Sequence, residues 1–248
     1  MNTKNKKTTK KTNKPTGYVV WQNKLIAMII LVKSSNKKTG NMIQSYIIRK
    51  DINPIEAVNN GKDYLICGNC PHRKNQATGR RTCYVNLGQG VLQVYKQFLL
   101  GKYPQFNPKK HSQILKNRML RLGTYGDPVF VPYRVWKFLL TFVKGRTGYT
   151  HQWSSNIDSN FKSIVMASCD SKADVILSNL LGYRSFVVVN HDDKDAKKTD
   201  INAILCVNKP HDKQCENCGL CNGNPNSMGK NIFIPAHGTS KRFVKNLL

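Results

Sequence analysis

From Tyr64 onward, short apolar runs alternate with segments of helical periodicity, and this alternation constrains the fold more than any other feature. It is typical of β-α-β units, in which helices join parallel strands of one sheet. Helical stripes cover 90–100 and 131–143, and Ser171 is placed to cap a third helix that ends at Gly182. The expected strands span residues 64–67, 119–123, 148–152, 164–167, 185–189 and 203–207.

Six parallel strands form either an open doubly wound sheet or a barrel. Polar or reactive side chains recur directly after the expected strands, and ligands collect at the carboxyl ends of parallel strands in both architectures. We therefore expect an α/β fold in the form of a complete or partial parallel β/α barrel. The expected organisation is a disordered basic arm (1–16), an N-terminal extension (17–63), the barrel-like domain (64–207) and a Cys-rich metal-binding C-terminal segment (208–248).

The chain is strongly basic, with 40 Lys+Arg against 13 Asp+Glu and a formal net charge of +27. Self-repulsion of this size opposes compaction unless a polyanion neutralises it, so we expect a nucleic-acid partner. Phosphate contacts are expected from arginines throughout the sequence, namely Arg80, Arg81, Arg118, Arg121, Arg134, Arg146 and Arg184. The longest apolar stretch, 25–32, is too short to span a membrane, so a cytoplasmic protein is expected.

The eight cysteines include two clusters with the spacing of metal ligands, since a Cys-x2-Cys pair brings two thiolates to one ion. The first cluster is Cys67, Cys70 and Cys83, and it needs a fourth ligand from His72, His237, a water or the second cluster. The second cluster is Cys206, Cys215, Cys218 and Cys221, with His237 as a further candidate. Both zinc and an iron–sulfur cluster suit such spacings, and structural zinc is the favoured interpretation. Cys169 is expected to be a small core residue.

Asp127 and Asp170 each follow an expected strand and precede a helix, so they are the candidate catalytic residues. Two carboxylates at one edge of a sheet supply a nucleophile and a general acid or base, or they bind Mg²⁺. The alternative is that each only caps a helix or turn. Aromatic and polar side chains nearby are the candidates for stacking and reading a base: Arg121, Tyr125, Tyr149, His151, Gln152 and Trp153.

Six motifs resemble a family of tailed-bacteriophage proteins: ICGNCPHR (66–73), TCYVN (82–86), RLGTYGDP (121–128), GYTHQW (148–153), MASCD (166–170) and CENCGLC (215–221). The layout is similar to that of queuine-type guanine transglycosylases. That resemblance implies a phage enzyme in the host cytoplasm that exchanges guanine in DNA for a 7-deazaguanine base, with Asp127 and Asp170 in chemistry and zinc near the C-terminus. The shorter chain, the extra N-terminal cysteines and the different cysteine spacing depart from the transglycosylase pattern.

Two other functions fit the sequence. The first is an iron–sulfur enzyme of radical type that uses Cys67, Cys70 and Cys83. The second is a zinc protein that binds nucleic acid without catalysis, in which the aspartates are only caps.

Overall fold

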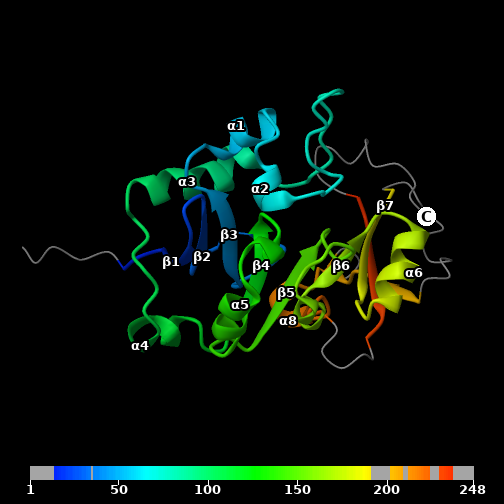
Figure 1. Ribbon diagram of the computed structural model, residues 1–248. Coiled ribbons are helices and arrows are strands. Elements are labelled where there is room, and N and C mark those ends of the chain that lie inside the picture. The colour runs from blue at the N-terminus through cyan, green and yellow to red at the C-terminus, as the bar shows by residue number, and fades with distance from the viewer. Residues whose placement is uncertain (1–13, 35, 191–201, 209–211, 224–228, 237–248) are drawn as a thin grey trace, which may run out of the picture.

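The computed structural model describes residues 14–34, 36–190, 202–208, 212–223 and 229–236, and its centre is one nine-stranded sheet (Figure 1). The strand order is β1-β2-β3-β4-β5-β6-β7-β9-β8. The first three strands run antiparallel, and every pairing from β3 to β8 is parallel. The strands are β1 (Gly17–Gln22), β2 (Ile26–Leu31), β3 (Ile43–Arg49), β4 (Met119–Tyr125), β5 (Gly145–Thr150), β6 (Met166–Cys169), β7 (Ser185–Val189), β8 (Ala203–Leu205) and β9 (Asn231–Pro235).

The expected α/β class with a mostly parallel sheet is confirmed. Within the described residues the sheet is open, because no pairing joins its two outer strands, β1 and β8. Strand β9 comes from the segment expected to be a metal module, and it lies between β7 and β8 in the sheet.

The predicted strand at residues 64–67 is wrong. These residues form the single helical turn α2 (Tyr64–Cys67), whose Gly68 N–H donates to the Tyr64 carbonyl. Strand β3 pairs with β4 instead, although its residues 43–49 belong to the expected N-terminal extension. A four-residue apolar run does not distinguish a strand from a buried helical turn, and long-range pairing decides between them. In α2, Ile66 is buried and Tyr64 is exposed.

The antiparallel strands β1, β2 and β3 carry much of the core. Strand β2 reads IAMIIL and is buried at its first five positions, so side chains on both faces of the sheet are covered here. A continuous apolar run of this kind is typical of a central strand that is covered on both faces. Buried residues of these strands and of β4 belong to one hydrophobic cluster, which fixes the position of β4 in the sheet.

Short helices connect the strands, and their capping follows ordinary rules. The Ser171 hydroxyl accepts from the Asp174 N–H at the start of α6, which confirms the predicted cap. In Figure 1, α1, α2 and α3 gather at one end of the first strands, and α6 packs beside β6 and β7. The helices are α1 (Pro54–Asn59), α2, α3 (Leu92–Leu99), α4 (Pro108–His111), α5 (Tyr133–Leu140), α6 (Lys172–Leu180) and α8 (Cys215–Cys218).

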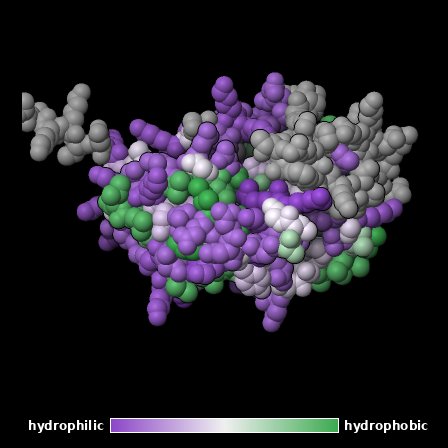
Figure 2. All heavy atoms as spheres, turned by 90° about the horizontal axis from the view of Figure 1, so that it is seen from above, coloured by the Kyte–Doolittle hydropathy of each residue, from purple (hydrophilic) through white to green (hydrophobic). Residues whose placement is uncertain are grey.

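The surface is largely hydrophilic in the view from above, with separate hydrophobic areas between charged regions (Figure 2). One hydrophobic area lies at the side of the molecule that carries α6, where Ile176, Leu177, Leu180 and Leu181 are exposed. None of the helices in the described residues has the length and apolar character needed to cross a bilayer.

Candidate metal centre

The first cysteine cluster lies beside the carboxyl ends of β4 and β5. Cys67 ends α2, Cys70 follows in a turn, and Cys83 comes from the loop that precedes α3. The three thiols are close enough to affect one another electrostatically. Burial, and then the negative charge of Asp63, raise the pKa of the Cys67 thiol, and burial likewise raises the pKa of Cys83. A bound metal cation stabilises the thiolate form of such cysteines and so offsets the effect of burial on their pKa.

Gln152 clamps the Cys-x2-Cys turn onto the end of β5. Its Nε2 donates to the Cys67 carbonyl at 3.2 Å, and its Oε1 accepts from the Asn69 N–H at 3.3 Å. Gly68 has a φ of 54°, and a Cβ at this position would lie 2.4 Å from Gln152 Oε1. Glycine is therefore required by both backbone conformation and space. On the other side of the turn, the Asp127 N–H donates to the Ile66 carbonyl at 2.7 Å.

Two arginines brace the loops that carry the thiols. Arg73 donates to the Gly68 carbonyl at 3.2 Å and forms an ion pair with the buried Asp63. Arg81 donates to the carbonyls of Cys83 and Val85, at 3.0 Å each. These guanidinium groups place positive charge beside the cluster, where it favours thiolate over thiol.

A histidine–aspartate–histidine group stands beside the thiols. His72 Nε2 lies 3.0 Å from Asp170 Oδ1, and His151 Nε2 lies 3.4 Å from Asp170 Oδ2. His151 directly follows β5 and Asp170 directly follows β6, so two neighbouring parallel strands deliver them to the same edge. Burial opposes ionisation of Asp170, but the two imidazoles outweigh it and hold its pKa below the usual range. Burial also opposes protonation of His151, but Asp170 and Cys70 raise its pKa to about 10.

Asp127 lies at the same edge, and both of its carboxylate oxygens accept hydrogen bonds. Its Oδ1 accepts from the Val129 N–H, and its Oδ2 accepts from the Thr150 hydroxyl at 3.0 Å and the His151 N–H at 2.9 Å. Burial raises its pKa, although these hydrogen bonds oppose the shift. The carboxylate therefore fixes the backbone of His151, which makes Asp127 a positioning residue for the histidine.

The side chains expected to bind a base occupy interior positions. Trp153 is 7% exposed, and its Nε1 donates to the Ser168 carbonyl at 2.8 Å. Tyr149 packs on Phe186 and is hydrogen-bonded to Cys221. The Arg121 guanidinium lies over the Tyr149 ring, 5.7 Å from its centroid. Tyr125 is buried near the first cluster, and its hydroxyl has no hydrogen-bond partner within the described part of the chain.

The thiols of the second cluster gather from β8, α8 and the residues that follow them. Cys206 follows β8, Cys215 and Cys218 form the ends of α8, and Cys221 is 8% exposed. Burial raises the pKa of Cys221 to about 12; the hydrogen bond with Tyr149 opposes this shift, and the neighbouring thiols add to it. The Cys221 carbonyl accepts from the Gly148 N–H of β5 at 3.1 Å, so the cluster is attached to the main sheet. His237 lies outside the described residues.

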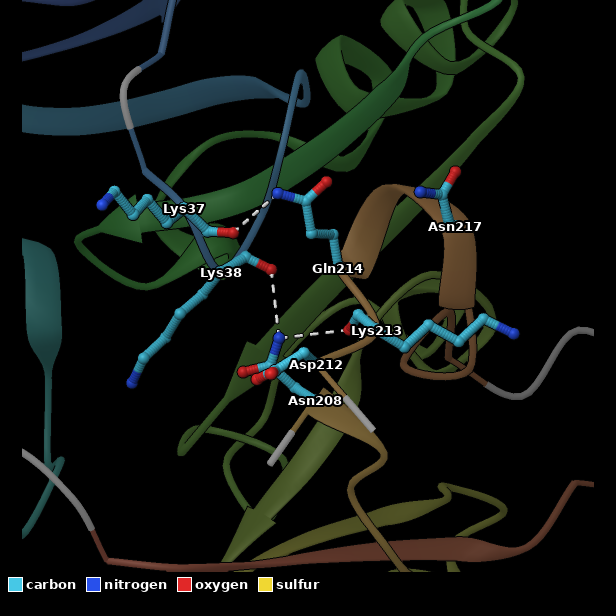
Figure 3. Close-up of a pocket in the computed structure, with 7 residues that line it drawn as sticks. All are labelled: Lys37, Lys38, Asn208, Asp212, Lys213, Gln214 and Asn217. Atoms are coloured by element: carbon cyan, nitrogen blue, oxygen red, sulfur yellow. Dashed lines mark hydrogen bonds between the residues drawn. The ribbon is translucent and has the colours of Figure 1, made fainter. Parts of the chain in front are cut away.

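A hollow of about 670 Å³ opens beside α8 (Figure 3). Gln214 Nε2 donates to the Lys37 carbonyl at 2.9 Å, and Asn208 Nδ2 donates to the Lys38 and Lys213 carbonyls, so the hollow joins the β2–β3 loop to the second cluster. Three lysines and one aspartate lie on its wall, which gives it a positive balance. The lining residues are Lys37, Lys38, Asn208, Asp212, Lys213, Gln214 and Asn217.

Most arginines expected to contact phosphates donate to the chain's own oxygens. Arg184 is buried and donates to carbonyls that include those of Leu220 and Lys230. Arg81, Arg118 and Arg146 also donate to backbone carbonyls, and Arg121 donates to the Tyr84 hydroxyl at 2.6 Å. Arg80 and Arg134 are exposed. Sequence alone does not separate such internal arginines from surface ones, because both kinds occur in loops and at strand starts.

The strand-end positions predict that Asp127, His151 and Asp170 lie near one another, and the structure brings all three together. The sequence predicts neither the contact of Gln152 with the Cys-x2-Cys turn nor that of Thr82 with His72. His72 was considered as a fourth ligand for the thiols, but here its ring nitrogens face Thr82 Oγ1 at 2.7 Å and Asp170. No periodicity or spacing marks these contacts, which depend on how the loop at 68–86 folds back.

Comparison with known proteins identifies no relative of this chain. No protein-family model matches the chain, and neither a curated protein nor a solved structure matches it.

Proposed function

We propose that this protein is a metalloenzyme acting on nucleic acid, with an iron–sulfur cluster bound by Cys67, Cys70 and Cys83. The observation that carries the proposal is the meeting of three partly buried thiols with His151 and Asp170 beside the carboxyl ends of parallel strands. That edge is where α/β enzymes collect their chemistry. The partial β/α barrel and the Cys-rich metal module are part of the same proposal.

The spacing of the thiols favours an iron–sulfur cluster over zinc. Tetrahedral zinc, with Zn–S bonds of about 2.3 Å, holds its sulfurs about 3.8 Å apart. Within the described residues, the group of three or more ligand atoms that lies within 4.8 Å consists of His72, His151 and Asp170, and the three thiols form no such group. An iron–sulfur cluster binds each cysteine through a different iron, so it accepts wider spacing. With three cysteines, one iron keeps an exchangeable position for a substrate or cofactor.

Metal analysis of protein purified without oxygen tests this proposal. We expect a brown protein that absorbs in the visible region and contains iron together with acid-labile sulfide. Colourless protein that contains zinc and no iron would contradict the iron–sulfur assignment. Reconstitution with ferrous iron and sulfide under the same conditions separates a lost cluster from a site that never holds one.

The second cluster is proposed to be a structural zinc site because its four cysteines, Cys206, Cys215, Cys218 and Cys221, match the ligand number of a closed tetrahedral site. Like those of the first cluster, these thiols form no group within 4.8 Å among the described residues, so the assignment depends on ligand number and not on spacing. The four thiols interact with one another, and α8 ends at Gly219, whose φ of 67° suits the tight turn before Cys221. A metal here would fasten the loop between β8 and β9 to β5. The Cys-x2-Cys-x2-Cys run also suits a second iron–sulfur cluster, and the same metal analysis distinguishes the two.

The net charge of +27 and the lysine-lined hollow support nucleic acid as the substrate or partner. Binding of duplex DNA should weaken steeply with salt, with a slope of log K against log salt of about −0.9 per neutralised phosphate. Changing Lys37 and Lys213 to alanine should reduce that slope by about 1 per lysine that contacts a phosphate. Fluorescence anisotropy at several salt concentrations measures both effects. A slope unaffected by the substitutions would place the DNA elsewhere on the protein.

Exchange of guanine in DNA for a 7-deazaguanine base is the second candidate function. The observation that favours it is that Asp127 and Asp170 both contact His151, which places two carboxylates around one site. In that reaction Asp170 is the better nucleophile, because its side chain is 22% exposed whereas Asp127 is buried. Incubation of DNA with a labelled 7-deazaguanine base should then give labelled DNA, and Asp170→Asn should abolish the labelling. Labelling that persists in this variant would reject Asp170 as the nucleophile.

A further inference from the structure

The contact between Asp170 and the two histidines has an unusual electrostatic requirement. An ionised carboxylate only accepts hydrogen bonds, so each imidazole nitrogen that faces it must carry a proton or share a cation with it. His72 Nε2 and His151 Nε2 both face Asp170, at 3.0 Å and 3.4 Å. The three ligand atoms lie within 4.8 Å of one another, and all three residues are largely shielded from solvent.

The two histidines differ in how their nitrogens are satisfied. His72 has a partner on each side, because Thr82 Oγ1 lies 2.7 Å from its Nδ1. His151 Nε2 is buried and has no hydrogen-bond partner within the described residues, since its approach to Asp170 lacks hydrogen-bond geometry. A second partner on the far nitrogen, such as Thr82, is the usual means of orienting a metal-binding histidine.

His72 Nε2 approaches Asp170 Oδ1 and His151 Nε2 approaches Asp170 Oδ2, so the distances of 3.0 Å and 3.4 Å suit an ion that both carboxylate oxygens face. Bonds of about 2.1 Å from a metal to histidine nitrogen or carboxylate oxygen put neighbouring ligands about 3.0 Å apart in an octahedron and about 3.4 Å apart in a tetrahedron. From these distances and the buried, unpartnered nitrogen, we infer that His72, His151 and Asp170 bind one divalent first-row transition-metal ion. This site is additional to the two cysteine clusters and does not depend on what they bind.

Two imidazoles and one carboxylate supply three ligands on one side of an ion. The other coordination positions stay open to water or substrate, which is the arrangement used for Fe(II) chemistry in many enzymes. The ligands come from three places: the loop after Cys70, the end of β5 and the end of β6. The ion would therefore stand at the same carboxyl edge as the thiols, where a substrate reaches both.

Titration with Mn²⁺ tests this site, because manganese prefers nitrogen and oxygen ligands and competes poorly for thiolates. Electron paramagnetic resonance of free Mn²⁺ reports how much is bound by the full-length protein. We expect one Mn²⁺ per chain, displaced by Fe²⁺, and loss of this binding in both Asp170→Asn and His72→Gln. Asp158→Asn is the matched control, because Asp158 only caps the short helix that follows it and asparagine caps equally well.

Two further measurements distinguish loss of the metal site from misfolding and from failure of the iron–sulfur proposal. Circular dichroism and thermal unfolding show whether Asp170→Asn and His72→Gln are folded, and two variants guard against the failure of one. Cys67→Ser should lose iron from the first cluster and still bind Mn²⁺, so failure of the iron–sulfur proposal would be seen separately. The inference is overturned if the unchanged protein binds no Mn²⁺, or if Asp170→Asn and His72→Gln bind it as tightly as Asp158→Asn does.

Discussion

Cys83→Ser should lose the iron and sulfide of the first cluster while the protein stays folded. Serine keeps the size of the side chain but replaces the soft thiolate that iron–sulfur clusters require. The loop itself should persist, because Arg81 holds it through the carbonyls of Cys83 and Val85 rather than through the thiol. Iron and sulfide analysis after anaerobic reconstitution, together with the visible spectrum, measures the loss.

Cys169→Ser is the matched control for this substitution. Cys169 is 1% exposed, and its Sγ lies 3.4 Å from Ser178 Oγ within the core. Burial raises its pKa to about 11, and no other cysteine in the described part of the chain contributes to that shift, so Cys169 stands apart from the thiols of both clusters. Serine reproduces its hydrogen bonds, and the iron content should not change. Equal iron in the Cys83 variant and this control would reject the cluster assignment.

Arg184→Ala should be the most destabilising single substitution outside the proposed metal sites. The guanidinium is buried and donates at 3.0 Å to the Leu220 and Gly223 carbonyls and to Asn222 Oδ1, and it also bonds the Lys230 carbonyl. Each buried acceptor left without a donor costs about 1–3 kcal/mol. We expect the free energy of unfolding to fall by about 4 kcal/mol, which lowers Tm by about 10 °C in a chain of this size.

Thermal unfolding of the metal-loaded protein checks this expectation, with Arg134→Ala as control. Arg134 is exposed on α5, where a surface substitution changes stability by about 0.5 kcal/mol at most. Because Arg184 joins β7 to the residues around Cys221, the variant should also release metal from the second cluster more readily. A Tm equal to that of the control would reject this stabilising role of Arg184.

The sequence predicts best where local signals and long-range pairing agree. Strand β7 was predicted with the bounds Ser185–Val189 that the structure has, because its apolar run is flanked by a helix end. The run at 64–67 carries an equally apolar pattern but forms a helix, since β3 already occupies the position beside β4. Such competition between segments far apart in sequence is invisible to periodicity.

In the candidate site, too, the sequence predicts the residues that strand ends position but not the partners that loops bring to them. Residues that directly follow strands, such as His151 and Asp170, were predictable because parallel strands end at one edge. The partners that set their roles were not, because Thr82 and Gln152 act through loops whose path depends on tertiary contacts. Trp153 was expected at the site from its place beside His151, but its ring belongs to the core.

The order β7-β9-β8 has a consequence for how the chain reaches its native state. Strand β8 is made before β9, yet among the described strands it pairs only with β9. During synthesis the outer edge of β7 therefore stays unpaired until residues 231–235 leave the ribosome. An exposed parallel edge invites intermolecular pairing, and contacts between distant segments form slowly. We therefore expect the nascent chain to be most prone to aggregation in the interval before β9 pairs with β7.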